Sequence, residues 1–115
     1  MSKEKALKHY TGREGHERLN CAQSVLAAFR EKFGIGPDTL RAYLGHGGGN
    51  APGGVCGAYA AARHILEKHH PGKLKELDEL FVREAGSIKC DEIRRARKLS
   101  CLGCVEKAAD LIAKL

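Results

Sequence analysis

Apolar residues recur at three- and four-residue steps along most of the chain, which is the spacing of one face of an α-helix. The clearest pattern runs from His16 to Phe33, and Gly34 marks its C-terminal end. Weaker helical patterns cover residues 37–44, 55–69, 73–85 and 100–115, and a helix start falls within 87–93. An alternating strand pattern is absent from the sequence. We therefore predict an all-α fold, a compact bundle of about five helices.

The length of 115 residues predicts a single domain, residues 1–115, in which residues 1–15 form an N-terminal extension or a short helix. No apolar run approaches the ~20 residues of a membrane-spanning helix, and the N-terminus lacks the apolar core of a signal peptide. We therefore expect a cytoplasmic protein that does not bind a membrane. The net charge is +6, but with three Phe, three Tyr and no Trp the sequence does not favour binding of nucleic acid.

A glycine-rich loop leads into the predicted helix 55–69. Residues 45–54 contain six glycines, a composition that permits positive φ angles and close backbone approach. We predict that Cys56, which follows this loop, lies in the first turn of a central helix. Free N–H groups and the helix dipole favour a thiolate there. The loop lacks the Gly-Lys-Ser/Thr ending of a phosphate-binding P-loop.

Five cysteines are the chemically informative feature of this composition. In a reducing compartment they are metal ligands or reactive thiols more often than disulfides. Cys90 lies close to a predicted helix start, and Cys101 and Cys104 occupy the first turn after Ser100, a good N-cap residue. Cys21 falls inside the predicted helix on its apolar side, where a cysteine is commonly a small buried residue. Three predicted helices thus begin at or beside a cysteine, which favours convergence on thiolates or on a thiolate-bound cluster.

Cys101 and Cys104 form the only closely spaced pair, a C-x-x-C sequence. Zinc knuckles, iron–sulfur proteins and thioredoxin-like dithiols all use this spacing. A zinc ribbon needs a second pair and a thioredoxin needs a strand–helix–strand context, and the sequence has neither. The other cysteines are more than thirty residues apart, so the tertiary fold has to build any shared site. The basic run 94–98 could offset negative charge near Cys101, although a solvated helix face is the simpler interpretation.

Four segments of the chain each contain a cysteine in a distinctive local context: Asn20-Cys21-Ala22-Gln23-Ser24-Val25, Gly53-Gly54-Val55-Cys56-Gly57-Ala58, Gly86-Ser87-Ile88-Lys89-Cys90 and residues 101–105. In this order they resemble the redox-active protein family named for its C-GCAxxG-C-C cysteine pattern. The resemblance runs from about Leu19 to the C-terminus. It implies a small helical protein with four characteristic cysteines that hold an iron–sulfur cluster or a related prosthetic group.

The same resemblance implies a set of metal ligands: Cys21, Cys56, Cys90 and one cysteine of the last helix. Cys101 is the preferred fourth ligand, because the final cysteine of the family stands four residues before a valine, and Val105 fits. Cys104 would then be a spare ligand or a resolving thiol. One departure from the family pattern is Ala61, which replaces the glycine that closes the second segment.

Within this set we predict Cys56 and Cys90 as the catalytic thiols. The predicted cofactor-binding positions are Gly54 and Gly57, because glycine on either side of Cys56 permits close backbone approach.

Three functions remain open from the sequence. The first is a metal or iron–sulfur site for electron transfer, with zinc as the alternative metal. The second is a metal-free dithiol protein in which Cys56 and Cys90 react and Cys21 or Cys101 resolves. The third is a non-enzymatic scaffold with buried cysteines. A redox partner protein is expected for the first two functions. A homodimer is a further option, because two ligands could come from a neighbouring subunit.

Overall fold

The computed structural model describes residues 6–7, 10, 12, 19–43 and 52–114. This part of the chain contains seven α-helices and no strand, which confirms the prediction of an all-α fold. The helices are α2 (Cys21–Ala28), α3 (Arg30–Phe33), α4 (Pro37–Ala42), α5 (Gly57–His69), α6 (Leu74–Ala85), α7 (Cys90–Ala96) and α8 (Cys101–Ala113). Short 3₁₀ turns, Pro52–Gly54 and Pro71–Lys73, precede α5 and α6. None of these helices is both long enough and apolar enough to cross a membrane.

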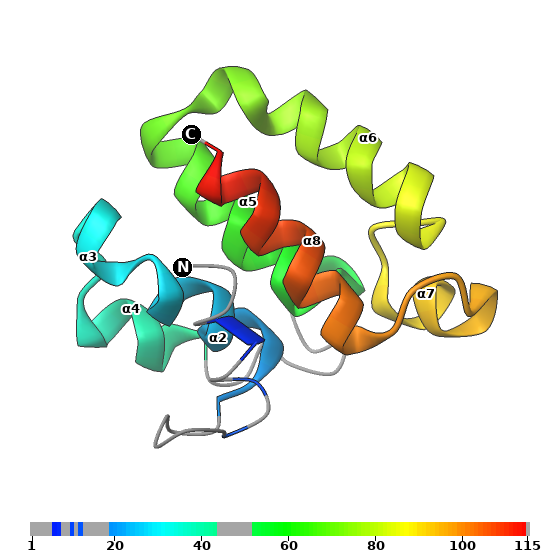
Figure 1. Ribbon diagram of the computed structural model, residues 1–115, viewed down its shortest axis with the longest axis horizontal. Coiled ribbons are helices and arrows are strands. Elements are labelled where there is room, and N and C mark those ends of the chain that lie inside the picture. The colour runs from blue at the N-terminus through cyan, green and yellow to red at the C-terminus, as the bar shows by residue number, and fades with distance from the viewer. Residues whose placement is uncertain (1–5, 8–9, 11, 13–18, 44–51, 115) are drawn as a thin grey trace.

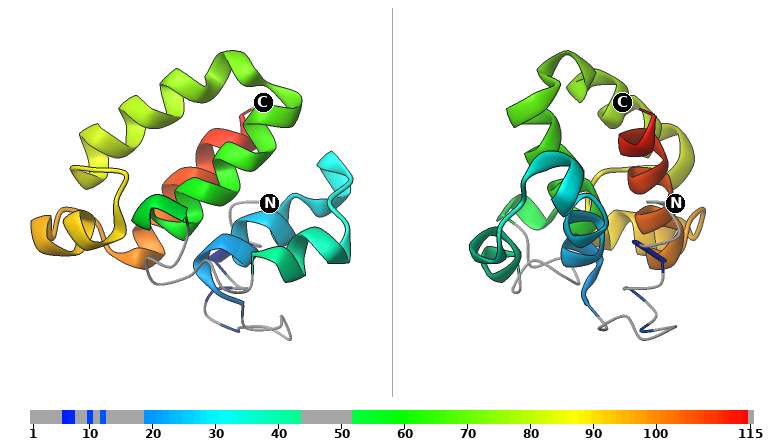
Figure 2. Two further views of the ribbon diagram at one scale, coloured as in Figure 1. Left: turned by 180° about the vertical axis from the view of Figure 1, so that it is seen from behind. Right: turned by 60° about the vertical axis from the view of Figure 1, so that its left-hand side comes forward.

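Three helices form the centre of the bundle. Helices α2, α5 and α8 pack pairwise against one another, and α6 covers α5 and α8 (Figure 1). The three central helices run in the same direction, so their N-terminal ends lie at the same end of the bundle, close to α7 (Figures 1 and 2). The short helices α3 and α4 lie beside α2, away from α7. This parallel arrangement places the cysteine-bearing helix starts at one end of the molecule.

The core is one continuous cluster of buried side chains drawn from nearly every helix. Its largest fully buried members include Tyr59, Phe29 and Phe81. Ala58, Ala61 and other alanines of α5 and α8 are also fully buried, and such small side chains let helix backbones approach closely. The Tyr59 hydroxyl donates a hydrogen bond of 2.6 Å to the Asp78 carboxylate, which joins α5 to α6.

The prediction of one helix over residues 16–33 is wrong within its described part. Helix α2 begins at Cys21, because Asn20 is extended (φ −71°, ψ 175°) and its side-chain oxygen accepts a hydrogen bond from the backbone N–H of Gln23. Cys21 is therefore the first residue of a helix and does not lie inside one. The helical pattern is interrupted again at Phe29 (φ −113°, ψ 12°), which separates α2 from α3. Residues 16–18 lie outside the described residues.

The predicted start of the central helix is also two residues early. Val55 forms an isolated antiparallel bridge with Lys89, and the backbone N–H of Cys56 donates to the Ile88 carbonyl at 2.8 Å. Both bonds hold residues 55–56 in an extended conformation, so α5 begins at Gly57 with Cys56 as its N-cap residue.

Three predicted helix boundaries are confirmed. Gly34 and Gly86 end their helices in the left-handed conformation, with φ of 63° and 89°, which glycine adopts without the steric cost of a Cβ atom. Ser100 caps α8, and its hydroxyl accepts a hydrogen bond of 3.0 Å from the Gly103 N–H. Most of the glycine-rich loop lies outside the described residues, but Gly53 and Gly54 have positive φ angles of 79° and 72°.

Candidate functional site

Four helices of the described chain start at a cysteine. Cys21, Cys90 and Cys101 are the first residues of α2, α7 and α8, and Cys56 is the N-cap residue of α5. The sequence predicted three such helix starts, and the structure adds the one at Cys21. The remaining cysteine, Cys104, lies one turn into α8.

The backbone between residues 55 and 89 brings two of these cysteines to adjacent positions. The Val55–Lys89 bridge and the hydrogen bond from Cys56 to Ile88 join the segment before α5 to the segment before α7. Cys56 and Cys90 lie at this connection, one in each segment. The electrostatic effect of Cys56 raises the pKa of Cys90. A two-residue backbone contact thus brings together thiols from distant parts of the sequence.

Cys56 and Cys104 form one pair of hydrogen-bonded thiols, and both are buried. The hydrogen bond with Cys104 raises the pKa of Cys56, and burial raises it further. Hydrogen bonds from the backbone N–H groups of Tyr59 and Ala58, at the start of α5, lower the pKa of Cys56. The net direction is upward, so Cys56 remains a neutral thiol at neutral pH.

Cys21 and Cys101 form the second pair. The Cys21 thiol donates a hydrogen bond to the sulfur of Cys101, and this bond is the main reason that the pKa of Cys101 falls to about 6. Burial opposes the shift, while a hydrogen bond from Tyr10 and the charge of Arg94 support it. Of the five cysteines, all in the described part of the chain, Cys101 is the one that is not fully buried. Cys101 is therefore partly exposed and is a thiolate at neutral pH, and its partner Cys21 is buried.

Cys90 lies between the two pairs. Burial raises its pKa, and the positive charge of Arg94 opposes the rise. The electrostatic effects of Cys56 and Cys101 also raise the pKa of Cys90. Cys90 is therefore close to one member of each pair.

A cavity of about 360 Å³ lies at this end of the bundle. It is lined by four cysteines, two apolar side chains, two arginines and one serine: Cys56, Cys90, Cys101, Cys104, Ile93, Leu99, Arg94, Arg97 and Ser100. Its volume is at the lower end of the range for small-molecule sites, roughly 300–1,000 Å³. Cys21 is not among the lining residues and lies behind Cys101.

The thiols do not form a ligand shell for a metal ion in this arrangement. Among the described residues, no group of three or more Cys, His, Asp or Glu side chains is placed so that it could hold one. The sulfurs are organised as two hydrogen-bonded pairs with Cys90 beside them. The metal-ligand roles predicted from the sequence therefore stay predictions, as do the catalytic roles of Cys56 and Cys90.

The two predicted cofactor-binding glycines flank Cys56 as expected from the sequence. Gly57 is the buried first residue of α5. Gly54 has a φ of 72°, and no atom lies within 4 Å of the position that a Cβ would take there. The backbone at Gly54 therefore requires glycine because of its conformation and not because of a close neighbour. The cofactor-binding role of both residues stays a prediction.

Two site residues were missed or undervalued by sequence reasoning. Tyr10 belongs to the N-terminal segment, which showed no chemical motif, yet its hydroxyl hydrogen-bonds to Cys101. Arg94 was part of a basic run that was interpreted most simply as a solvated face, yet it acts on both Cys90 and Cys101. Spacing along the sequence carries no signal for Tyr10. The position of Arg94 one helical turn after Cys90 was the available signal for the arginine.

The side chains of Asn20 and Gln23 connect the start of α2 to the C-terminal end of α4. In addition to capping α2, Asn20 donates from Nδ2 to the Tyr43 carbonyl at 3.0 Å. Gln23 donates from Nε2 to the Leu40 carbonyl at 2.8 Å. The Leu40 carbonyl also accepts from the Tyr43 N–H at 3.3 Å, so the two side chains add hydrogen bonds at the C-terminal end of α4 and fix α4 against the turn that bears Cys21.

The fold and the site define a class of protein: a small all-α protein with cysteines at the converging ends of its helices. The family model described as "Putative redox-active protein (C_GCAxxG_C_C)" matches residues 19–115. The chain belongs to this family, and membership supports a redox role. Comparisons with curated proteins and with solved structures gave no match.

Proposed function

We propose that the protein is a thiol–disulfide redox protein whose reactive pair is Cys101 and Cys21. The observation that carries this proposal is the hydrogen bond between their sulfur groups. A disulfide has an S–S bond of about 2.05 Å, so the two sulfurs have to approach each other to form it. Both residues are the first of their helices, where the backbone N–H groups favour a thiolate.

The two cysteines take different roles because Cys101 is partly exposed and Cys21 is buried. Cys101 is partly exposed and lines the cavity, so it is the sulfur that attacks an incoming disulfide. Its lowered pKa, about 6, supports this role because the thiolate is the nucleophile. Cys21 is buried behind it and serves as the resolving thiol. Cys56 and Cys104 are both buried and the pKa of Cys56 is raised, so this pair stays reduced while Cys101 reacts.

The overall reaction is a two-electron exchange. Cys21 and Cys101 lose two protons and two electrons as their S–S bond forms, and a disulfide acceptor gains them and becomes two thiols. Reduction of the Cys21–Cys101 disulfide by a dithiol partner protein returns the chain to its starting state. A reducing cytoplasm, in which such disulfides are transient and catalytic, is the location that we propose.

Thiol counting under defined redox conditions tests the proposal. Incubation with an excess of a disulfide reagent should lower the number of free thiols from five to three, and a dithiol reductant should restore all five. Cys101→Ser should abolish the loss of two thiols. The matched control is Cys104→Ser, which removes a buried cysteine of the same helix and should leave the two-thiol loss intact. Five free thiols in wild type under both conditions would contradict the proposal.

A thiolate-bound metal or iron–sulfur cluster is a second candidate, favoured by one observation: four cysteines line a single cavity. Holding a metal would require the described sulfurs to move closer together, since no three of these groups now share a possible metal position. A homodimer that supplies further thiols is part of this candidate. Anaerobic purification with metal analysis and a visible spectrum tests it. Iron would absorb visible light, closed-shell zinc would not, and stoichiometric absence of both would count against the candidate.

A further inference from the structure

Among the described residues, the charged side chains that line the cavity beside Cys101 are all basic. Arg94 and Arg97 are among its lining residues, and the described residues that line it include no carboxylate. Ile93 and Leu99 supply an apolar surface between the basic and the sulfur-bearing sides. Such a lining suits a small molecule that combines a short carbon chain with negative charge.

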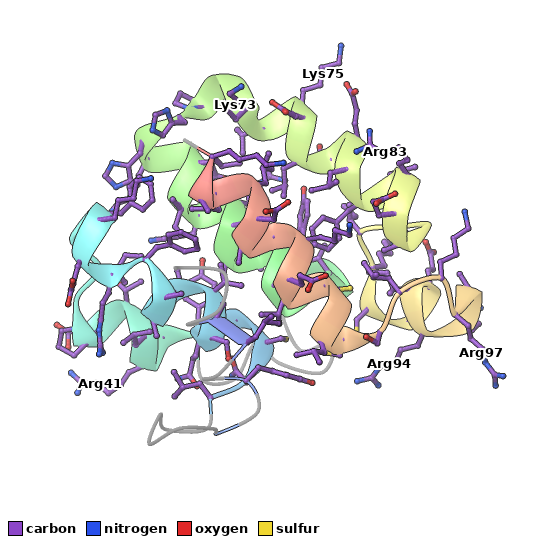
Figure 3. The ribbon with its side chains drawn as sticks, viewed as in Figure 1. Arg41, Lys73, Lys75, Arg83, Arg94 and Arg97 are labelled. Atoms are coloured by element: carbon purple, nitrogen blue, oxygen red, sulfur yellow. The ribbon has the colours of Figure 1, made fainter. Side chains whose placement is uncertain are left out.

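Arg94 is a basic residue whose charge lowers the pKa of two of the thiols. It acts electrostatically on both Cys90 and Cys101, and in Figure 3 it extends from α7 beneath the start of α8. Arg97 projects from the outer end of α7 (Figure 3). Neither arginine forms an ion pair with a carboxylate in the described part of the chain.

The two acidic residues at the start of α7 do not pair with Arg94. The Asp91 carboxylate is paired with Arg95 at 2.9 Å on the exposed side of α7, and the Glu92 carboxylate accepts a hydrogen bond of 2.6 Å from the Ser87 hydroxyl. The guanidinium of Arg94 is thus left for a ligand in the cavity, and a carboxylate is a group that a guanidinium binds with two parallel hydrogen bonds.

We propose that the cavity selects small disulfides that carry carboxylate groups, with Arg94 holding a carboxylate while Cys101 meets one of the two sulfur atoms. This assignment rests on the proposed redox function and names the substrate class of the same site. The cavity volume of about 360 Å³ admits a molecule of a few carbon atoms on each sulfur, whereas a folded protein could present only a narrow segment there.

The exchange proceeds in two displacements. Cys101 attacks one sulfur of the small disulfide, a bond forms between them, and the other half leaves as a thiolate. Cys21 then gives up its proton to the departing thiolate, and its sulfur attacks Cys101. The second half leaves as a thiolate, which takes a proton from water, and the Cys21–Cys101 disulfide remains. Counting the proton that Cys101 gave to water when it ionised, the two cysteines have lost two electrons and two protons, and the small disulfide has become two thiols.

Three small disulfides of different charge test the proposal: dithiodiglycolate, which is anionic, hydroxyethyl disulfide, which is neutral, and cystamine, which is cationic. The rate of thiol loss is measured for wild type, Arg94→Gln, Arg94→Lys and the control Arg95→Gln at low and high salt. Comparing each reagent between variants removes the intrinsic difference between leaving groups. Arg95 belongs to the same helix but is paired with Asp91, so its substitution controls for a general loss of positive charge.

We expect Arg94→Gln to slow the reaction with dithiodiglycolate by roughly threefold to tenfold relative to the reaction with hydroxyethyl disulfide at low salt, because one positive charge is lost. Arg94→Lys should recover most of the rate, Arg95→Gln should change it little, and added salt should reduce the difference. Equal slowing of all three reagents in Arg94→Gln would overturn the charge selection while leaving the redox function standing. If no disulfide oxidises the wild-type protein, the redox function fails and the substrate class fails with it.

Discussion

Cys21 and Cys101 come from opposite ends of the described chain, and their sulfur groups meet in a hydrogen bond at the starts of two parallel helices. The pair is asymmetric, since Cys21 is buried and Cys101 is partly exposed. The buried thiol donates and the exposed sulfur accepts, which favours the thiolate form of Cys101. This asymmetry is the basis on which we propose Cys101 as the attacking sulfur and Cys21 as the resolving sulfur.

The first prediction concerns the pH dependence of alkylation. Because the pKa of Cys101 is lowered to about 6, its rate of reaction with iodoacetamide should rise through that pH and level off above it. Cys21→Ala removes the hydrogen-bond donor, so the inflection should move upward toward the ordinary thiol value of about 8.5. Peptide-resolved mass spectrometry measures the rate at Cys101 alone. Cys104→Ala is the control and should leave the inflection in place. An inflection that is the same in Cys21→Ala as in wild type would contradict the hydrogen bond.

The second prediction concerns Asn20, whose side chain has two separable functions. Its oxygen accepts from the Gln23 N–H at 2.7 Å, and its nitrogen donates to the Tyr43 carbonyl at 3.0 Å. Asn20→Ala loses both bonds and should lower the free energy of unfolding by about 1–2 kcal/mol. Asn20→Asp keeps the cap but cannot donate, so its loss should be smaller. Urea denaturation of the reduced protein measures both. Equal losses in the two variants would contradict a contribution of the cap on the Gln23 N–H, and no loss in Asn20→Asp would show that the bond to Tyr43 contributes nothing.

The third prediction concerns Gly103 within the C-x-x-C sequence. A Cβ added at Gly103 would lie 2.7 Å from Cδ1 and 2.9 Å from Cγ of Leu99, which lines the cavity. Gly103→Ala should therefore displace Leu99 and destabilise the fold, despite the better helix propensity of alanine. In a Leu99→Ala background the clash is gone, and the same substitution should become neutral or stabilising by up to about 1 kcal/mol. A double-mutant cycle in urea measures the sign change, and additive effects would contradict the contact.

Strong apolar periodicity and glycine ends were sufficient to predict most of the helices. Helix α6 and the last helix were located to within two residues, because Gly86 and Ser100 are local signals that act within one turn. The start of α2 was missed because Leu19 continues the apolar pattern while Asn20 caps the helix. A local hydrogen bond overrode the periodicity at that position.

The family pattern indicated which cysteines matter but not how they pair. Sequence reasoning kept Cys21 and Cys101 as equal resolving candidates for Cys56 or Cys90. In the structure the pKa of Cys56 is instead raised mainly by Cys104, and the pKa of Cys101 is lowered mainly by Cys21. These pairings depend on the relative rotation of α2, α5 and α8 and on the bridge at Val55. Neither is encoded in the spacing of cysteines along the chain.

The most direct test of the central claim is identification of the disulfide that forms first. The reduced wild-type protein is titrated with a disulfide reagent, free thiols are blocked at acidic pH, and disulfide-linked peptides are identified by mass spectrometry. We predict a link between the peptides that contain Cys21 and Cys101, with Cys56, Cys90 and Cys104 blocked as free thiols. A first link between Cys56 and Cys104, or the absence of any link, would contradict it.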